Sequence, residues 1–116
     1  MKIGTDITVV SRIQKSRERF GERFLNRFLN KEEQQLSSKI ESIAGYWASK
    51  EAIAKALGCG IGEELSFLDI IIYKDAKNAP HFKLTHKAQK RHNIKSSSLS
   101  ISHDGGFAIA VVILVI

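Results

Sequence analysis

The sequence FAIAVVILVI at residues 107–116 most constrains the fold, because all ten of its residues are apolar. A helix that spans a membrane needs about 20 apolar residues, so this run is too short to form one. Its β-branched residues favour a buried strand. Asp104, Gly105 and Gly106 precede the run and are typical of a tight turn. The run therefore predicts one arm of a hairpin, with residues 99–103 as the other arm.

Three further strands are expected. Residues 2–10 are rich in Ile, Val and Thr, which predicts the first of them. Residues 65–73 and 81–85 flank a segment at 74–80 whose Asp, Asn and Pro residues are typical of a turn. These two strands are expected to form a second hairpin. The sequence predicts an α+β fold in which an antiparallel sheet is packed with helices.

A helix is expected after the first strand. Ser11 can cap a helix that begins near Arg12, because its side-chain oxygen can accept from a free backbone N–H. Phe20, Phe24 and Phe28 follow at i, i+4 and i+8. This spacing predicts one apolar stripe that faces the core.

Other sequence signals mark where helices begin and end. Asn30 and Glu33 have the spacing of a capping box, which predicts a further short helix. The longest helix is expected over about residues 42–57. It ends at Gly58, since glycine adopts the left-handed conformation without penalty. Thr85 is expected to cap a short basic helix.

A chain of 116 residues is expected to form one domain over 1–116. A chain this short has little room for a deep cleft, which favours a site shared between subunits in a C2 or C3 assembly. Residues 11–31 carry seven basic and two acidic side chains, and residues 83–95 carry five basic and no acidic ones. Such surfaces serve solubility alone, or bind nucleic acid, a phosphorylated small molecule or an acidic protein.

The single cysteine, Cys59, excludes an internal disulfide and favours a reducing compartment. No partner that would mark a nucleophile stands beside it, so we interpret it as inert. Residues 1–10 lack a long apolar stretch, and Asp6 interrupts them, so they do not resemble a signal peptide. These features predict a soluble cytoplasmic protein.

The longest predicted helix carries charged residues beside its bulkiest aromatic residues. At about 100° per residue one broad arc holds several of these side chains. They are Trp47, Lys50, Glu51, Ala54 and Lys55. Ala48, Ala52 and Ala56 form the next stripe, which lets another backbone approach closely. The helix alone favours an exposed Glu51–Lys55 pair on the surface.

Asp6 suggests a second interpretation of this arc. It lies inside an apolar strand, where a carboxylate needs a partner, a solvent-facing position or a metal ion. Asp6 and Glu51 together suit Mg²⁺ with phosphate, and nearby lysines would neutralise the remaining phosphate charge. His103 ends a strand beside a glycine turn, where it could bind phosphate, act as a base or have no chemical role. Gly58 and the glycines after it follow a helix, so we interpret them as a helix stop and not as a phosphate loop.

Six pieces of sequence follow one another over nearly the whole chain. They are GTDI, RFLNRFLNKEE, AGYWASKEAIAKALGCGIG, LSFLDIII, NAP and SISHDGGFAIAVVI. With these pieces, which include the pattern W-x-x-K-E-A-x-x-K-A with G-x-D upstream, the chain resembles the bacterial holo-acyl-carrier-protein synthases. These are small stand-alone 4′-phosphopantetheinyl transferases, and the pattern is the signature of their family.

The resemblance implies that coenzyme A donates its 4′-phosphopantetheine arm to a serine of apo acyl carrier protein, for fatty acid biosynthesis. Adenosine 3′,5′-bisphosphate would be released. Asp6 and Glu51 would coordinate Mg²⁺ with the pyrophosphate, and Lys55 would join them as a catalytic residue. The residues implied to bind coenzyme A are Lys50, Lys55, Gly58, Pro80 and His103. The base that deprotonates the serine is either a carboxylate or a water that a carboxylate activates.

The resemblance also implies partners. Small members of this family are homotrimers with active sites at subunit interfaces. Arg12 would contact the acidic carrier protein, with Arg19 and Arg23 as companions. No nucleic acid or membrane partner is expected.

The chain departs from the family pattern at three places. Tyr46 stands where the family usually has an arginine, Ala79 where it has a lysine, and Asp104 where it often has a hydroxyl. These departures concern contacts with the nucleotide. Two alternatives to the transferase are a small nucleic-acid-binding module, suggested by the basic segments, and a non-catalytic coenzyme A-binding subunit of the same fold.

Overall fold

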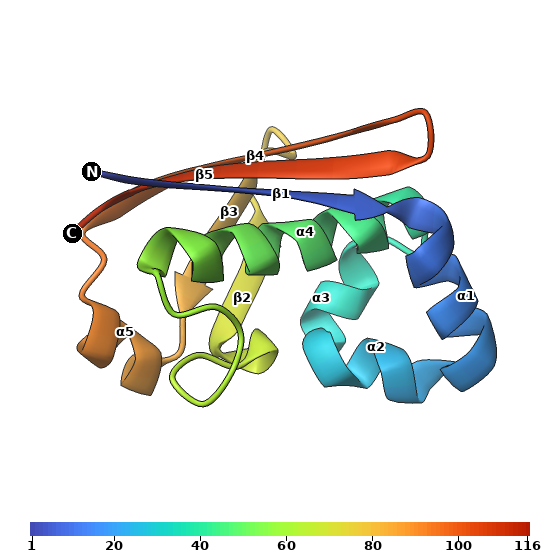
Figure 1. The fold of residues 1–116 in the computed structure, drawn as a ribbon, viewed down its shortest axis with the longest axis horizontal. Helices are drawn as coiled ribbons and strands as arrows, with labels where there is room; N and C mark the ends of the chain where they lie inside the picture. Colours follow the sequence, from blue (N-terminus) through green and yellow to red (C-terminus); the bar gives the residue numbers. More distant parts are fainter.

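A computed structural model describes residues 1–116, and its strands form two antiparallel sheets (Figure 1). The larger sheet has the order β1-β5-β4, with β1 (Lys2–Val9), β4 (Ser96–Asp104) and β5 (Phe107–Val115). The smaller sheet pairs β2 (Ile70–Lys74) with β3 (Pro80–Leu84). The predicted α+β class and both predicted hairpins are confirmed. The expected strand at 65–73 is only partly right, because its middle forms the 3₁₀ turn η1 (Phe67–Asp69).

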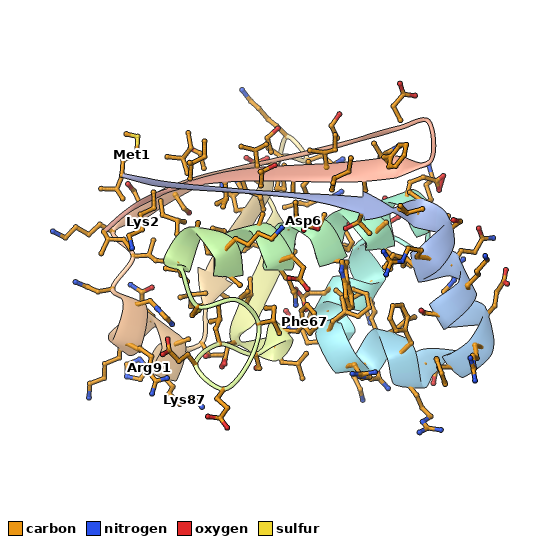
Figure 2. The ribbon with its side chains drawn as sticks, in the orientation of Figure 1. Met1, Lys2, Asp6, Phe67, Lys87 and Arg91 are labelled. Carbon is orange, nitrogen blue, oxygen red and sulfur yellow. The ribbon has the colours of Figure 1, made fainter.

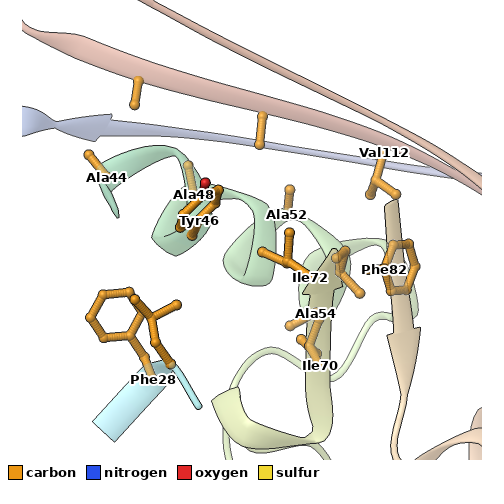
Figure 3. Packing of buried hydrophobic residues seen from close by; sticks show 14 of the residues in the cluster. Phe28, Ala44, Tyr46, Ala48, Ala52, Ala54, Ile70, Ile72, Phe82 and Val112 are labelled. Atoms are coloured by element: carbon orange, nitrogen blue, oxygen red, sulfur yellow. The ribbon is translucent and has the colours of Figure 1, made fainter. Parts of the chain in front are cut away.

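The 18-residue helix α4 (Ile40–Leu57) lies against the larger sheet (Figure 1). A Cβ atom added at Gly4 of β1 would overlap the carbonyl of Ala52, and one at Gly45 would lie 2.7 Å from Ile101 of β4. Figure 3 shows the side chains of Ala48 and Ala52 beneath the sheet. The predicted stripe of small residues, Ala48, Ala52 and Ala56, is buried. As predicted, it allows another backbone to approach closely, and it thereby places β1 directly over α4.

Shorter helices complete the fold: α1 (Val10–Phe20), α2 (Glu22–Phe28), α3 (Lys31–Leu36) and α5 (His86–His92). Two predictions for this region are wrong. Ser11 does not cap α1, because β1 runs straight into the helix and no side chain caps it. The phenylalanine stripe is interrupted at Gly21, whose φ of 58° separates α1 from α2. Phe20 is therefore 48% exposed, whereas Phe24 and Phe28 lie in the core.

Of the other three predicted helix ends, two are correct. Asn30 and Glu33 form the expected capping box, with each side chain accepting from the backbone N–H of the other at 2.8 Å. Gly58 follows α4 in the left-handed conformation, with φ 81°. Thr85 does not cap α5. Its hydroxyl donates instead to Asp69 Oδ1 at 2.7 Å and so ties β3 to η1.

Only one face of the strand β5 is buried, although the sequence predicted a buried strand. Every second residue packs on α4, namely Ala108, Ala110, Val112 and Leu114. The residues between them are exposed on the outer face, together with Ile3 and Ile7 of β1. These are Phe107, Ile109, Val111, Ile113 and Val115. The larger sheet therefore carries an apolar outer face that nothing in this chain covers. None of the helices is long and apolar enough to cross a membrane.

Candidate active site

Asp6 lies on the inner face of β1, between Gly4 and Thr8, where the strand crosses α4. Figure 2 labels it at this crossing. The ammonium of Lys55 donates to Asp6 Oδ1 at 2.8 Å, and the hydroxyl of Thr8 donates to Asp6 Oδ2 at 2.9 Å. Lys55 also reaches the carbonyl of Thr5 at 3.4 Å. Asp6 therefore has a partner on each oxygen although it lies in an otherwise apolar strand, because α4 brings a lysine to it.

Glu51 lies one helical turn before Lys55 and lines the same cavity as Asp6. The cavity has a volume of about 370 Å³. The polar side chains in its wall are Asp6, Thr8, Arg12, Ser16 and Glu51. Burial raises the pKa of Glu51, and the charge of Asp6 raises it further, while the charge of Lys55 opposes both effects. The two carboxylates are thus close enough to repel each other, and a cation between them would relieve this repulsion.

Lys55 is 55% exposed at its side chain, so its ammonium is open to solvent beside the carboxylates. Its hydrogen bond to Asp6 and the charge of that carboxylate raise the pKa of Lys55. The group is therefore cationic at neutral pH. Two carboxylates, two hydroxyls and the guanidinium of Arg12 line one cavity, and the ammonium of Lys55 is bonded to one of the carboxylates. This donor set suits a hard divalent cation with a phosphate. The oxygen donors of Asp6 and Glu51 fit Mg²⁺ in kind.

Lys50 does not share this environment, although the helical arc grouped it with Glu51 and Lys55. Its side chain is 0% exposed. Its ammonium donates to the carbonyl of Phe28 at 2.6 Å, to Glu33 Oε1 at 3.0 Å and to the carbonyl of Phe67 at 3.0 Å. These three bonds use all three protons of the ammonium. Lys50 therefore has no free donor for a phosphate, and the arc divides into a buried half and an exposed half.

Pro80 and His103 line a second cavity of about 190 Å³, together with Tyr46 and Lys74. The hydroxyl of Tyr46 is buried and has no hydrogen-bond partner, and the ammonium of Lys74 lies 5.9 Å from the centre of the tyrosine ring. This cavity borders β4, whereas the cavity of Asp6 borders β1, and these are opposite edges of the larger sheet. The sequence analysis assigned His103 and Asp6 to one site, but within a single chain they line two separate cavities.

Most of the other predicted positions lie outside the wall of the Asp6 cavity. Gly58 follows Lys55 by one turn, and its N–H donates to the Lys55 carbonyl at 3.0 Å. Of the three predicted arginines only Arg12 lines the cavity. Arg19 lies over the ring of Phe20 at 5.2 Å, and Arg23 borders a separate small hollow.

Sequence reasoning missed two polar residues of the cavity wall. Thr8 lies two residues after Asp6, and the period-2 alternation of a strand would have placed both on one face. Ser16 lies one turn after Arg12 on α1 and shares its side of that helix. The alternation of the strand could therefore have predicted Thr8 from the sequence. No sequence pattern pointed to Ser16.

Residues 2–112 match the family model described as the 4′-phosphopantetheinyl transferase superfamily. The chain is 56% identical to a holo-acyl-carrier-protein synthase of a Sulfurovum species, over 96% of this chain and 93% of the relative. It is 54% identical to the Campylobacter lari protein of the same name, over 95% of each.

Solved structures agree with these sequence relatives. The Helicobacter pylori holo-acyl-carrier-protein synthase, solved in complex with coenzyme A, matches with a TM-score of 0.95 and 54% identity, over 97% of this chain and 99% of that one. The Neisseria meningitidis synthase matches with a TM-score of 0.87 and 34% identity, over 97% of this chain and 96% of that one.

Proposed function

The chain belongs to the 4′-phosphopantetheinyl transferase superfamily and is an enzyme of its holo-acyl-carrier-protein synthase family. From this premise we propose that it transfers the 4′-phosphopantetheine group of coenzyme A to a serine of an apo acyl carrier protein. The reaction forms a new phosphoester at the serine oxygen and breaks the pyrophosphate bond of coenzyme A. Adenosine 3′,5′-bisphosphate leaves, and the product serves fatty acid biosynthesis in the cytoplasm.

The observation that supports this proposal is the cluster of Asp6, Glu51 and Lys55, in which the two carboxylates line one cavity and the ammonium of Lys55 donates to Asp6 Oδ1. Phosphoryl transfer needs charge stabilisation and positioning more than covalent help from the protein. Lys55 contributes a positive charge for a phosphate oxygen and holds Asp6 Oδ1 in place. Thr8 holds Asp6 Oδ2, so the carboxylate has one orientation before any substrate binds.

Asp6 and Glu51 are the residues that would hold Mg²⁺. When bound, the ion would polarise the attacked phosphate and stabilise the departing one. Glu51 contributes a carboxylate whose pKa is raised by burial and by Asp6. The serine proton would pass to a carboxylate, or to a water molecule that a carboxylate activates.

The second cavity is the proposed place for the nucleotide end of coenzyme A. It offers His103, Pro80, the ammonium of Lys74 and the unpaired hydroxyl of Tyr46. Lys74 could supply the basic contact that Tyr46, in place of the family arginine, does not. The Helicobacter pylori relative is described as a complex with coenzyme A, which supports the choice of ligand.

We also propose that the active site is shared between neighbouring copies of the chain in a homotrimer. The two cavities lie at opposite edges of one sheet, so one coenzyme A would join the first cavity of one copy to the second cavity of the next. The apolar outer face of the larger sheet supports the assembly. Contiguous exposed apolar surface of this kind marks an interface. Its centre is formed by Ile109, Val111 and Ile113.

The acidic carrier protein is expected to dock at α1. Arg12 lines the cavity, and Arg19 and Arg23 extend the basic surface from there along α1 to α2. Complementary charge would speed encounter and orient the carrier serine toward the phosphate. One core, to which both sheets and α4 contribute, supports a single domain over residues 1–116.

Intact mass spectrometry tests the reaction. Apo acyl carrier protein incubated with the enzyme, coenzyme A and Mg²⁺ should gain one phosphopantetheine, and chelation of Mg²⁺ should prevent this. Asp6→Ala and Glu51→Ala should lose the activity while keeping the oligomeric state of the unchanged enzyme. Full activity in both variants would exclude the proposed metal ligands, and no mass gain with the unchanged enzyme would exclude the reaction.

A further inference from the structure

A second group of ligating side chains lies where α4 and α5 end, and the proposed reaction does not use it. Cys59 and Glu64 belong to the loop that follows α4, and His92 is the last residue of α5. One ligand atom of each lies within 4.8 Å of the other two. Figure 1 shows this loop descending from the end of α4 and lying between α5 and the 3₁₀ turn before β2. Two separate segments of the chain therefore bring a thiol, a carboxylate and an imidazole together.

The backbone fixes the loop that carries two of these groups. The N–H of Gly60 donates to the carbonyl of Ala54 at 3.2 Å, and the N–H of Gly62 donates to that of Leu65 at 2.9 Å. The side chain of Leu65 is fully buried and holds the far end of the loop. The end of α5 is also fixed, since the N–H of Asn93 donates to the carbonyl of Gln89 at 2.7 Å. Hydrogen bonds thus tie both segments to the rest of the fold.

An independent observation at His92 points to a ligand. Its Nε2 atom is buried and has no hydrogen-bond partner. Buried polar atoms in folded proteins are nearly always paired, and an unpaired one destabilises the fold. Coordination to a metal ion is one way in which a buried imidazole nitrogen is satisfied. The unpaired nitrogen of His92 therefore indicates a bound ligand, which the proximity of the three side chains alone would not.

We infer that Cys59, Glu64 and His92 form a zinc site that clips the loop after α4 to the end of α5. Thiolate, imidazole and carboxylate are the three side-chain ligand types that Zn²⁺ uses, and water would complete its tetrahedron. Zinc holds such ligands about 3.3–3.8 Å apart, so the three side chains, whose ligand atoms lie within 4.8 Å of one another, would turn inward by at most about 1 Å. The thiolate disfavours Mg²⁺, which prefers oxygen ligands. The two proposed metal sites are thus distinguished by their donors.

Titration of the chelator-treated full chain with Co²⁺, and then with Zn²⁺, tests this site. Because Cys59 is the only cysteine, a thiolate-to-cobalt charge-transfer absorption reports on this position alone. We expect the band to saturate at one Co²⁺ per chain, to disappear when Zn²⁺ is added and to persist in excess Mg²⁺. Zinc should also raise the melting temperature.

Two variants and one control complete the test. Cys59→Ser should abolish the band, and His92→Gln, which keeps the thiol, should weaken Co²⁺ binding at least about tenfold. Glu63→Gln changes an exposed carboxylate next to the cluster and should bind as the unchanged chain does. Absence of the band, or equal Co²⁺ affinity in His92→Gln and the unchanged chain, would overturn the site. Neither result depends on transferase activity, so failure here leaves the proposed reaction untouched.

Discussion

Lys50 and Lys55 lie on the same helix, and each binds a carboxylate, yet their surroundings differ completely. Lys50 and its partner Glu33 are 0% and 1% exposed, whereas Lys55 and its partner Asp6 are 55% and 13% exposed. The buried pair lies between α2, α3, α4 and η1, because the ammonium also binds the carbonyls of Phe28 and Phe67. The exposed pair lies at an open cavity. One pair holds the fold together, and the other is available to a substrate.

The difference in burial predicts opposite consequences for the two lysines. Burial lowers the pKa of Lys50, while the charge and hydrogen bond of Glu33 raise it in part. Removing one partner of such a pair leaves an uncompensated charge in the interior, which costs about 3–5 kcal/mol. Exposed pairs contribute about 0–1 kcal/mol. Loss of Lys50 should therefore affect stability, and loss of Lys55 should affect activity.

The largest expected effect is the loss of stability in Lys50→Met. Glu33 would keep its bonds from the N–H groups of Asn30 and Ile72, but its charge would be buried without a cation. We expect the free energy of unfolding to fall by about 3–5 kcal/mol, measured by urea denaturation followed through the fluorescence of Trp47. The double variant Lys50→Met/Glu33→Gln, which removes both charges, should recover part of this loss. A loss below about 1 kcal/mol in the single variant would contradict the structural role of Lys50.

The same double variant also tests a prediction from the family resemblance. Lys50 was expected to contact coenzyme A, but its three protons are bound inside the protein. Because these bonds leave no proton of Lys50 for a phosphate, the folded double variant should bind coenzyme A with the affinity of the unchanged enzyme in a calorimetric titration. Weaker binding by more than about tenfold would instead show that Lys50 serves the substrate.

Lys55→Met should give the opposite result, with a large effect on activity and a small one on stability. We expect the transfer rate to fall about a hundredfold, since removal of one donor to developing phosphate charge has an effect of this order. The free energy of unfolding should change by less than about 1 kcal/mol. The measurement is the initial rate of carrier modification at saturating substrates. Lys55→Arg keeps the charge and should restore part of the rate. If Lys55→Met lost as much stability as Lys50→Met, the two lysines would not have the different roles assigned to them.

Charge reversal at Arg12 should have a smaller effect, limited to the carrier protein. Arg12 lines the cavity of Asp6, so Arg12→Glu should raise the KM for the acidic carrier about tenfold and weaken its dependence on salt. Lys87→Glu on α5 makes the same change in net charge at the opposite end of the molecule (Figure 2). It should leave the KM near that of the unchanged enzyme. Equal effects of both variants would show that net charge alone matters, and not a docking surface on α1.

The sequence predicted the exposed lysine better than the buried one, and the reason is physical. Asp6 was a local anomaly, an acid inside an apolar strand, and it directed attention to Glu51 and Lys55. The partner of Lys50 lies 17 residues away on α3, so no local spacing revealed it. The helical spacing gives the direction in which a side chain points, but not whether other elements cover it. Lys50 is buried because α2, α3 and η1 pack around it.

Two other features show the same limit. The phenylalanine spacing continued across Gly21, so periodicity alone predicted one stripe, although the backbone turns there at φ 58°. The strand at 107–115 is apolar at every position, so the alternation that normally distinguishes an inner face from an outer one was missing. Only the packing of α4 against one side of this strand distinguishes its buried face from its exposed face. The capping box at Asn30 and the glycine stop at Gly58 were predicted correctly, whereas the single cap residues Ser11 and Thr85 were not, because neither side chain caps its helix.

The smallest expected effect concerns η1, which supplies Lys50 with its third acceptor, the carbonyl of Phe67. Burial raises the pKa of Asp69, but hydrogen bonds from Ser66 and Thr85 more than offset this, and the pKa lies below its ordinary value of 3.8. A carboxylate with a lowered pKa adds stability above its unfolded pKa, and this stability is lost as the pH falls through the folded value.

Asp69→Ala should therefore cost about 1 kcal/mol at neutral pH, and the cost should shrink as the pH falls below 3.8. Urea denaturation of both chains from pH 7 to pH 3 measures this difference. Glu63→Ala, at an exposed position of the loop before η1, is the matched control, and its difference should stay flat. If the cost of Asp69→Ala is also independent of pH, the ionised carboxylate does not stabilise η1.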